Sequence, residues 1–171
     1  DRDRSALQER YAELAESIAE EIEHGKQVGY LTLGDAMTYS TYIYTLDAVL
    51  ARCPDIITKT IPGVTSFCAV AAATSWPLGE QKERVLTLPC PENMELLEKA
   101  IEENDVVILM KMGRRLGEVL GLLDKLGIRQ HCALGHRVGM AEEKLLTSLD
   151  TRAIPDSLGY LSTMLIRKTS R

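Results

Sequence analysis

Hydrophobic residues repeat at steps of three and four positions near the start of the chain, which predicts an amphipathic helix. Ser5 followed by Gln8 has the form of a capping box, so we expect the helix to begin there. Gly25 is well suited to end it, because glycine adopts the left-handed conformation at little cost. Further helices are expected over residues 39–52, 65–74, 94–103 and 115–126.

Short apolar runs bounded by turn residues predict the strands. Residues 28–33 form one such run and end in Gly34-Asp35, as expected for a buried strand that leads into a loop. Residues 57–61 predict another short strand, and Pro62-Gly63 interrupts the chain directly after it. Later strands are expected over residues 85–88, 106–110, 132–138, 144–148 and 160–167.

The order of these elements predicts an α/β protein. Helices alternate with strands at first and strands then follow one another, so we expect a mostly parallel sheet closed by antiparallel strands. Pro62-Gly63 marks the expected boundary between two α/β parts, residues 1–61 and residues 62–171. The first part is expected to be the remainder of a larger domain.

Composition narrows the class of protein. Hydrophobic residues make up 45% and charged residues 26% of the 171 residues, as in soluble globular proteins. No apolar run approaches the roughly 20 residues that span a bilayer, and the charged start does not resemble a signal peptide. We therefore expect a cytoplasmic protein. The net charge of −5 argues against general nucleic-acid binding, which favours a basic surface.

Neither the cysteines nor the histidines have the spacing of a metal site. The four cysteines form no Cys-x-x-Cys pair, and the three histidines do not supply the usual zinc spacing. We expect no bound metal and reduced, buried thiols.

Candidate ligand-binding residues lie at, or directly after, the ends of four predicted strands. Open α/β sheets bind ligands at the carboxyl ends of their strands, which favours these positions. Each also has an ordinary structural interpretation: Asp35 can cap its own turn, Thr65 or Ser66 can cap a helix, and Met110 can fill the core. The segments are residues 31–41, 60–67, 106–114 and 133–140.

Taken in order, three motifs resemble those of the S-adenosylmethionine-dependent tetrapyrrole methyltransferases: Gly34-Asp35, Pro62-Gly63-Val64-Thr65-Ser66 and Leu109-Met110-Lys111. The family usually has a proline after Gly-Asp, where this chain has Ala36. The continuation to Thr41, together with Tyr160-Leu-Ser162, most resembles the enzymes that methylate C-20 of precorrin-2 or cobalt-factor II. The likeness extends over the chain from Ser5 onward.

The resemblance implies a two-domain tetrapyrrole methylase fold, with a truncated parallel-sheet N-terminal domain and a mixed-sheet C-terminal domain. It also implies a homodimer. Members of the family begin with a strand and a Gly-x-Gly-Pro-Gly-Asp loop, and this sequence contains no such loop. We therefore expect a family member that lacks its first segment.

The resemblance further implies that S-adenosylmethionine is the methyl donor and a tetrapyrrole the substrate. The methyl group of S-adenosylmethionine is already activated on a sulfonium, so the protein mainly aligns the reactants and excludes water. This alignment can lower the barrier by about 7–11 kcal/mol. No catalytic residue is assigned. Tyr39 and Arg114 are candidates to bind the substrate, with Arg115 and Arg137 as further candidates. The implied cofactor-binding residues are Leu33, Gly34, Asp35, Thr38, Thr65, Ser66, Met110 and Val138, with Leu161 and Ser162 as weaker candidates.

Two other functions fit the same motifs. The first is that of another member of the same superfamily, such as a different corrin-ring, siroheme or non-tetrapyrrole methylase, which would share the cofactor-binding residues. A chain without the opening glycine-rich loop also fits a non-catalytic fragment that binds the cofactor or dimerises.

Overall fold

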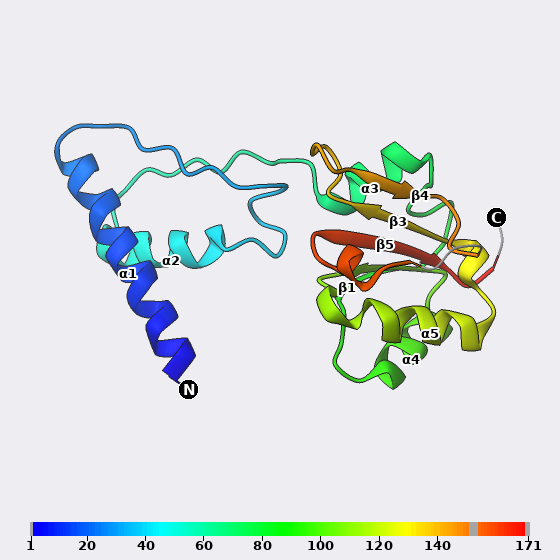
Figure 1. The fold of residues 1–171 in the computed structure, drawn as a ribbon. Helices are drawn as coiled ribbons and strands as arrows, with labels where there is room; N and C mark the ends of the chain where they lie inside the picture. Colours follow the sequence, from blue (N-terminus) through cyan, green and yellow to red (C-terminus); the bar gives the residue numbers. More distant parts are fainter. Residues whose placement is uncertain (1, 151–153, 170–171) are drawn as a thin grey trace. The chain divides into compact units, whose positions relative to one another are not determined.

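The computed structural model describes residues 2–150 and 154–169, and their side chains from residue 6 onward. The chain divides into two compact units, Asp1–Thr65 and Ser66–Arg171 (Figure 1). The boundary lies shortly after Pro62-Gly63.

The first unit contains two packed helices, α1 (Arg2–Glu23) and α2 (Tyr42–Arg52). Helix α1 begins at Arg2, so the predicted start at Ser5 is wrong, and the side chain of Ser5 lies outside the described residues. No glycine or proline stands between residues 2 and 5 to interrupt a helix. The predicted end is confirmed: Gly25 has φ of 75° and donates to the carbonyl of Ile22 at 2.8 Å.

Helix α2 starts later than predicted because Tyr39 has φ of 53°, which a right-handed helix does not allow. The hydroxyl of Ser40 accepts a hydrogen bond from the backbone N–H of Tyr42 at 3.1 Å and so satisfies one of the free donors at the helix start.

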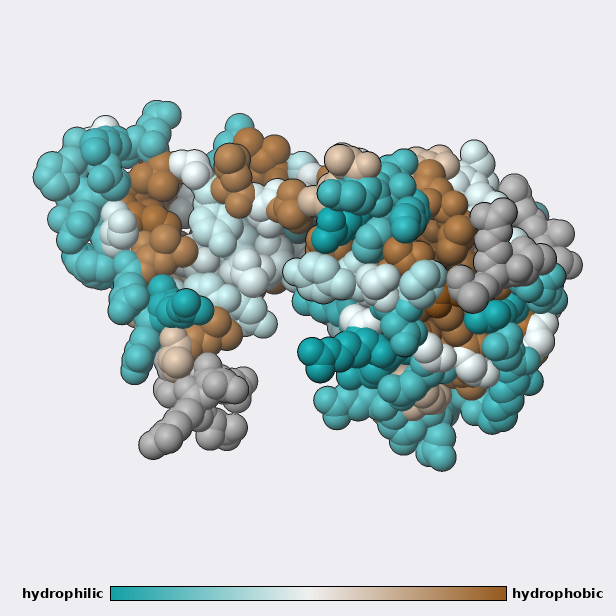
Figure 2. All heavy atoms as spheres, in the orientation of Figure 1, coloured by the Kyte–Doolittle hydropathy of each residue, from teal (hydrophilic) through white to brown (hydrophobic). Residues whose placement is uncertain are grey.

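The strands predicted over residues 28–33 and 57–61 are wrong. No described residue of the first unit belongs to a strand, and the side chains of Leu31 and Ile57 are 94% and 98% exposed. A strand requires a neighbour to accept its backbone hydrogen bonds, and no described segment takes that role here. The expected parallel sheet of the first domain is therefore absent from the described residues of this unit, and Figure 2 shows hydrophobic residues at its surface.

The second unit contains one mixed five-stranded sheet in the order β1-β2-β5-β3-β4. Among the strand pairs of the described residues, only β1–β2 is parallel, so the expectation of a mostly parallel sheet is wrong. The reason is that the last strand returns between β2 and β3 and runs antiparallel to both. The strands are β1 (Val85–Pro89), β2 (Val106–Met110), β3 (Cys132–His136), β4 (Lys144–Leu146) and β5 (Ser162–Arg167).

Helices cover both faces of this sheet (Figure 1). Helix α3 (Ser66–Thr74) packs on one face, where Val70 belongs to the same buried hydrophobic cluster as Ile108 and Leu165. Helices α4 (Met94–Glu103) and α5 (Leu116–Leu126) pack on the other. Short 3-10 turns cover Gly113–Arg115, Arg129–His131 and Asp156–Gly159.

Gly135 is a point of close approach between α3 and the sheet. A Cβ atom at this position would lie 2.4 Å from Cγ2 of Val70, a distance that real contacts do not reach. Because side chains alternate between the faces of a strand, Gly135 faces α3 while its neighbours Leu134 and His136 face the other way. The glycine thereby sets the position of α3 over the end of β3.

Candidate cofactor-binding site

The carboxylate of Asp35 organises the first predicted ligand segment. Its Oδ1 accepts hydrogen bonds from the backbone N–H of Met37 and from the hydroxyl of Thr38, both at 3.0 Å. Its Oδ2 accepts from the backbone N–H of Gly63 at 2.9 Å. These bonds, that from Gly63 foremost, hold the pKa of Asp35 below its ordinary value of 3.8. Asp35 therefore joins the Gly-Asp loop to the Pro-Gly segment.

Two glycines make this junction possible. A Cβ atom on Gly63 would lie 2.2 Å from the carbonyl oxygen of Gly34, so the two backbones approach too closely for any side chain. Gly34 itself has φ of 79°, in the left-handed region. Leu33 and Tyr39, on either side of the loop, are exposed, while Ala36, directly after Asp35, is buried.

In the second unit the structure brings together Ser66 and Met110, which are 44 residues apart. The hydroxyl of Ser66, in the first turn of α3, lies 3.9 Å from the sulfur of Met110 at the end of β2. Thr163 on β5 donates to the hydroxyl oxygen of Ser66 at 3.0 Å. Thr163 is not among the residues that the sequence singles out. Its only signal there is a hydroxyl within an apolar strand.

The same edge of the sheet carries unusual backbone conformations. Lys111, Arg137 and Leu161 have φ of 56°, 48° and 52°, and they stand directly after β2, directly after β3 and directly before β5. Non-glycine residues rarely adopt such angles, and they concentrate at binding sites. The backbone N–H of Arg137 donates to the carbonyl of Leu161 at 3.0 Å. These turns also explain why β3 and β5 are shorter than predicted.

His136 and Ser162 form a buried pair at this edge, on the sheet face opposite Thr163. Nδ1 of His136 lies 3.0 Å from the hydroxyl of Ser162, which also bonds to the carbonyl of Leu158. Because a carbonyl only accepts, the hydroxyl donates to Leu158 and accepts from His136. The proton of a neutral His136 therefore sits on Nδ1.

The three candidate arginines differ in their surroundings. Arg115 donates to the carbonyl of Cys90 at 3.0 Å, and Arg137 pairs with Glu142 at 2.9 Å, which lowers the pKa of that carboxyl group. Arg114 is exposed in the turn that follows β2. Val138, after β3, packs against the core under α3.

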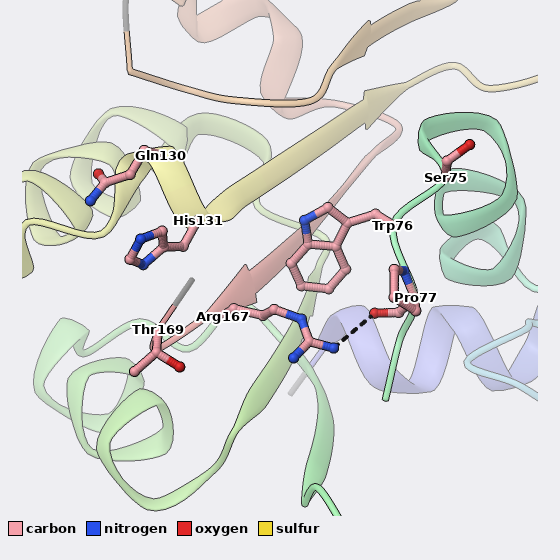
Figure 3. A pocket seen from close by; sticks show the side chains of 7 residues that line it. All are labelled: Ser75, Trp76, Pro77, Gln130, His131, Arg167 and Thr169. Carbon is pink, nitrogen blue, oxygen red and sulfur yellow. Dashed lines mark hydrogen bonds between the residues drawn. The ribbon is translucent and has the colours of Figure 1, made fainter. Parts of the chain in front are cut away.

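A pocket of about 200 Å³ lies at the opposite edge of the same sheet (Figure 3). The guanidinium group of Arg167 lies over the Trp76 ring, 5.0 Å from its centroid, and donates to Glu83 at 3.0 Å and to the carbonyl of Pro77 at 3.3 Å. Its positive charge is therefore already paired, and we assign no cofactor contact there. The lining residues are Ser75, Trp76, Pro77, Gln130, His131, Arg167 and Thr169.

Two features relevant to other kinds of site are absent from the part of the chain that the structure describes. Within residues 2–150 and 154–169, no cluster of three or more His, Cys, Asp or Glu side chains is arranged to hold a metal ion. No helix in those ranges has the length and apolar character needed to cross a membrane.

The fold and these motifs define a class. The family model of the Tetrapyrrole (Corrin/Porphyrin) Methylases matches residues 1–152, and the chain belongs to this family. The resemblance expected from the motifs is thereby confirmed.

Among its relatives, the chain is 32% identical over 160 residues to the cobalt-precorrin-2 C(20)-methyltransferase of Salmonella typhimurium. The match covers 91% of this chain and 65% of that protein, so the chain spans less than two thirds of this relative's length.

Solved structures show the same fold at lower identity. The cobalt precorrin-4 methyltransferase CbiF has a TM-score of 0.68 at 19% identity, covering 90% of this chain and 69% of that one. A uroporphyrin-III C-methyltransferase from Thermus thermophilus, in complex with S-adenosyl homocysteine, has a TM-score of 0.50 at 14% identity, covering 78% and 62%.

Proposed function

We propose that the chain belongs to an enzyme that transfers a methyl group from S-adenosylmethionine to C-20 of precorrin-2 or of cobalt-factor II, in cobalamin biosynthesis. The observation that carries this proposal is the match, over nearly the whole chain, to a protein named cobalt-precorrin-2 C(20)-methyltransferase. A homodimer, which the family resemblance implies, and a cytoplasmic location, which we expect from the composition of the sequence, belong to the same proposal.

S-adenosylmethionine, when bound, supplies a methyl group already activated on a sulfonium. The task left to the chain is to hold the donor in line with the substrate carbon and to keep water away. We assign this holding role to three places: the Gly34-Asp35 loop, the segment with Thr65 and Ser66, and the ends of strands β2 and β3. Both backbone and side chains contribute. The assigned residues are Leu33, Gly34, Asp35, Thr38, Thr65, Ser66, Met110 and Val138.

The structure supports the assignment in two ways. Asp35 and Gly63 fix the first segment in one conformation, as a preorganised binding loop requires. In the second unit, the strained turns at Lys111 and Arg137 adjoin Met110 and Val138, so the assigned residues lie where the backbone departs from regular structure.

The assay must distinguish this function from two alternatives. The likeness in fold to a cobalt precorrin-4 methyltransferase fits action on a different corrin precursor. The second is a polypeptide that binds the cofactor, or dimerises, without turnover.

A methyl-transfer assay separates these possibilities. The chain would be incubated with isotope-labelled S-adenosylmethionine and, separately, with precorrin-2, cobalt-factor II and cobalt-precorrin-4, with the Salmonella enzyme as positive control. We expect label at C-20 of precorrin-2 or cobalt-factor II. Label only on the cobalt-precorrin-4 product supports the first alternative. Cofactor binding without transfer to any substrate supports the second.

Arg114→Ala is expected to raise the KM for the tetrapyrrole roughly three- to tenfold, because an exposed arginine that bonds a substrate carboxylate contributes modestly. Affinity for S-adenosylhomocysteine should not change. Arg84→Ala provides the matched control, since Arg84 is also exposed but precedes β1, at the other edge of the sheet. Equal KM values for the two variants would remove Arg114 from the substrate site.

A further inference from the structure

Thr163 occupies a position where an apolar residue would be expected. It lies on β5, the central strand, is 3% exposed, and stands opposite Met110 of β2 and Gly135 of β3. Alternation along the strand places it on the face covered by α3, together with Leu165. The residues next along that face on the two adjacent strands, Ile108 and Ala133, are apolar. A buried hydroxyl in such surroundings needs a hydrogen-bond partner.

That partner is Ser66, and the direction of the hydrogen bonds follows from the atoms involved. Thr163 donates to the hydroxyl oxygen of Ser66 at 3.0 Å. The Ser66 hydroxyl in turn lies 3.9 Å from the sulfur of Met110, which has no proton to give. These contacts therefore form a series from Thr163 through Ser66 to Met110, in which each bond polarises the next. It connects three elements that are distant in sequence: β5, α3 and β2.

We propose that Thr163 is a positioning residue of the cofactor site, which acts through Ser66 and Met110 rather than on the cofactor itself. This inference rests on the proposed function, in which Ser66 and Met110 contact S-adenosylmethionine. Methionine has three rotatable bonds and fills space adaptably, so its thioether adopts one arrangement only when a neighbour restrains it. The hydroxyl of Thr163 fixes the orientation of Ser66, and Ser66 restrains the sulfur of Met110.

The first test needs no ligand. The six methionine methyl groups are labelled with carbon-13 in the full chain, and Met110→Leu identifies the Met110 signal by its disappearance. Thr163→Val keeps the branched shape but removes the hydroxyl, and we expect it to shift the Met110 signal as Ser66→Ala does. Thr163→Ser restores the donor and should return the signal to its original position. An unchanged Met110 signal in Thr163→Val overturns the proposal.

The second test measures affinity for S-adenosylhomocysteine by calorimetry. Thr163→Val is expected to weaken binding roughly five- to tenfold, the loss expected for one buried hydrogen bond, and Thr163→Ser to recover most of it. Thr87→Val, on the edge strand β1, controls for the loss of a strand threonine and should bind normally.

A double-mutant cycle tests whether the effect passes through Ser66. In the Ser66→Ala background, Thr163→Val should change affinity by less than about twofold, because the hydroxyl that connects Thr163 to Met110 has been removed. If the double variant instead loses affinity by the product of the two single effects, the proposed series of contacts is contradicted. If the unmodified chain binds no S-adenosylhomocysteine, the proposed function fails, while the Met110 signal still decides whether Thr163 orders this edge.

Discussion

Gly63→Ala is expected to weaken the binding of S-adenosylhomocysteine by roughly tenfold or more, a cost of about 1.4 kcal/mol or above. The added Cβ atom would lie 2.2 Å from the carbonyl oxygen of Gly34, so the two backbones must move apart. This movement also breaks the hydrogen bond from the Gly63 N–H to Asp35. The loop that carries Leu33 to Thr38 then loses its attachment, and calorimetric titration measures the consequence.

Gly29→Ala is the matched control for this variant. Gly29 belongs to the same unit, and a Cβ atom there would meet nothing within 4 Å. We expect Gly29→Ala to bind like the unmodified chain. Normal binding by Gly63→Ala would show that the junction between the two segments is not part of the cofactor site.

The bond between Asp35 and Gly63 also has a defined pH dependence. The hydrogen bonds that Asp35 accepts lower its pKa below the ordinary value of 3.8. The stability that they provide is therefore complete above pH 3.8 and is lost as the pH falls through the lower pKa of the folded state. Around neutral pH, this junction does not contribute to any change of affinity with pH.

Glu83→Ala is expected to lower the stability of the second unit by about 2–3 kcal/mol, which corresponds to a fall in Tm of roughly 10 °C. Arg167 is only 7% exposed, and its guanidinium group donates to both carboxylate oxygens of Glu83. Without Glu83 a buried cation is left unpaired. The side chain of Glu83 keeps 26% exposure, so the expected loss is smaller than for a fully buried pair.

Glu98→Ala is the control for Glu83→Ala. It shows how much stability is lost when an ion-paired glutamate is removed without leaving a buried cation unpaired. Glu98 is as shielded as Glu83, but its partner Lys125 is 65% exposed, at a distance of 2.8 Å. Such a pair contributes at most about 1 kcal/mol. Thermal unfolding followed by circular dichroism compares the two variants, and equal Tm values would show that Arg167 does not depend on Glu83.

Elements of the second unit could be predicted from sequence because their patterns are local. Residues 94–103 and 106–110 form the expected helix and strand with the expected bounds. Residues 28–33 also contain several apolar side chains but have no partner strand among the described residues, so they form no strand and stay exposed. The insertion of β5 between β2 and β3 depends on pairing between distant segments, and a local pattern carries no information about it.

The candidate site was predictable where a motif is contiguous. Gly34-Asp35 and Pro62-Gly63 indicated the family, although the sequence left open whether Asp35 binds a ligand or caps its turn. The structure shows the second role directly, and contact with the cofactor stays a prediction. Thr163 could not be found in this way, because its partner Ser66 is 97 residues distant.

The central claim is that this chain binds the cofactor of the tetrapyrrole methylases, and calorimetric titration with S-adenosylhomocysteine tests it most directly. The Salmonella enzyme, titrated under the same conditions, provides the positive control. We predict saturable binding at one site per chain, weakened by Gly63→Ala and unchanged by Gly29→Ala. A folded chain that produces no binding heat and fails to compete for labelled S-adenosylmethionine, while the control binds, would contradict the account.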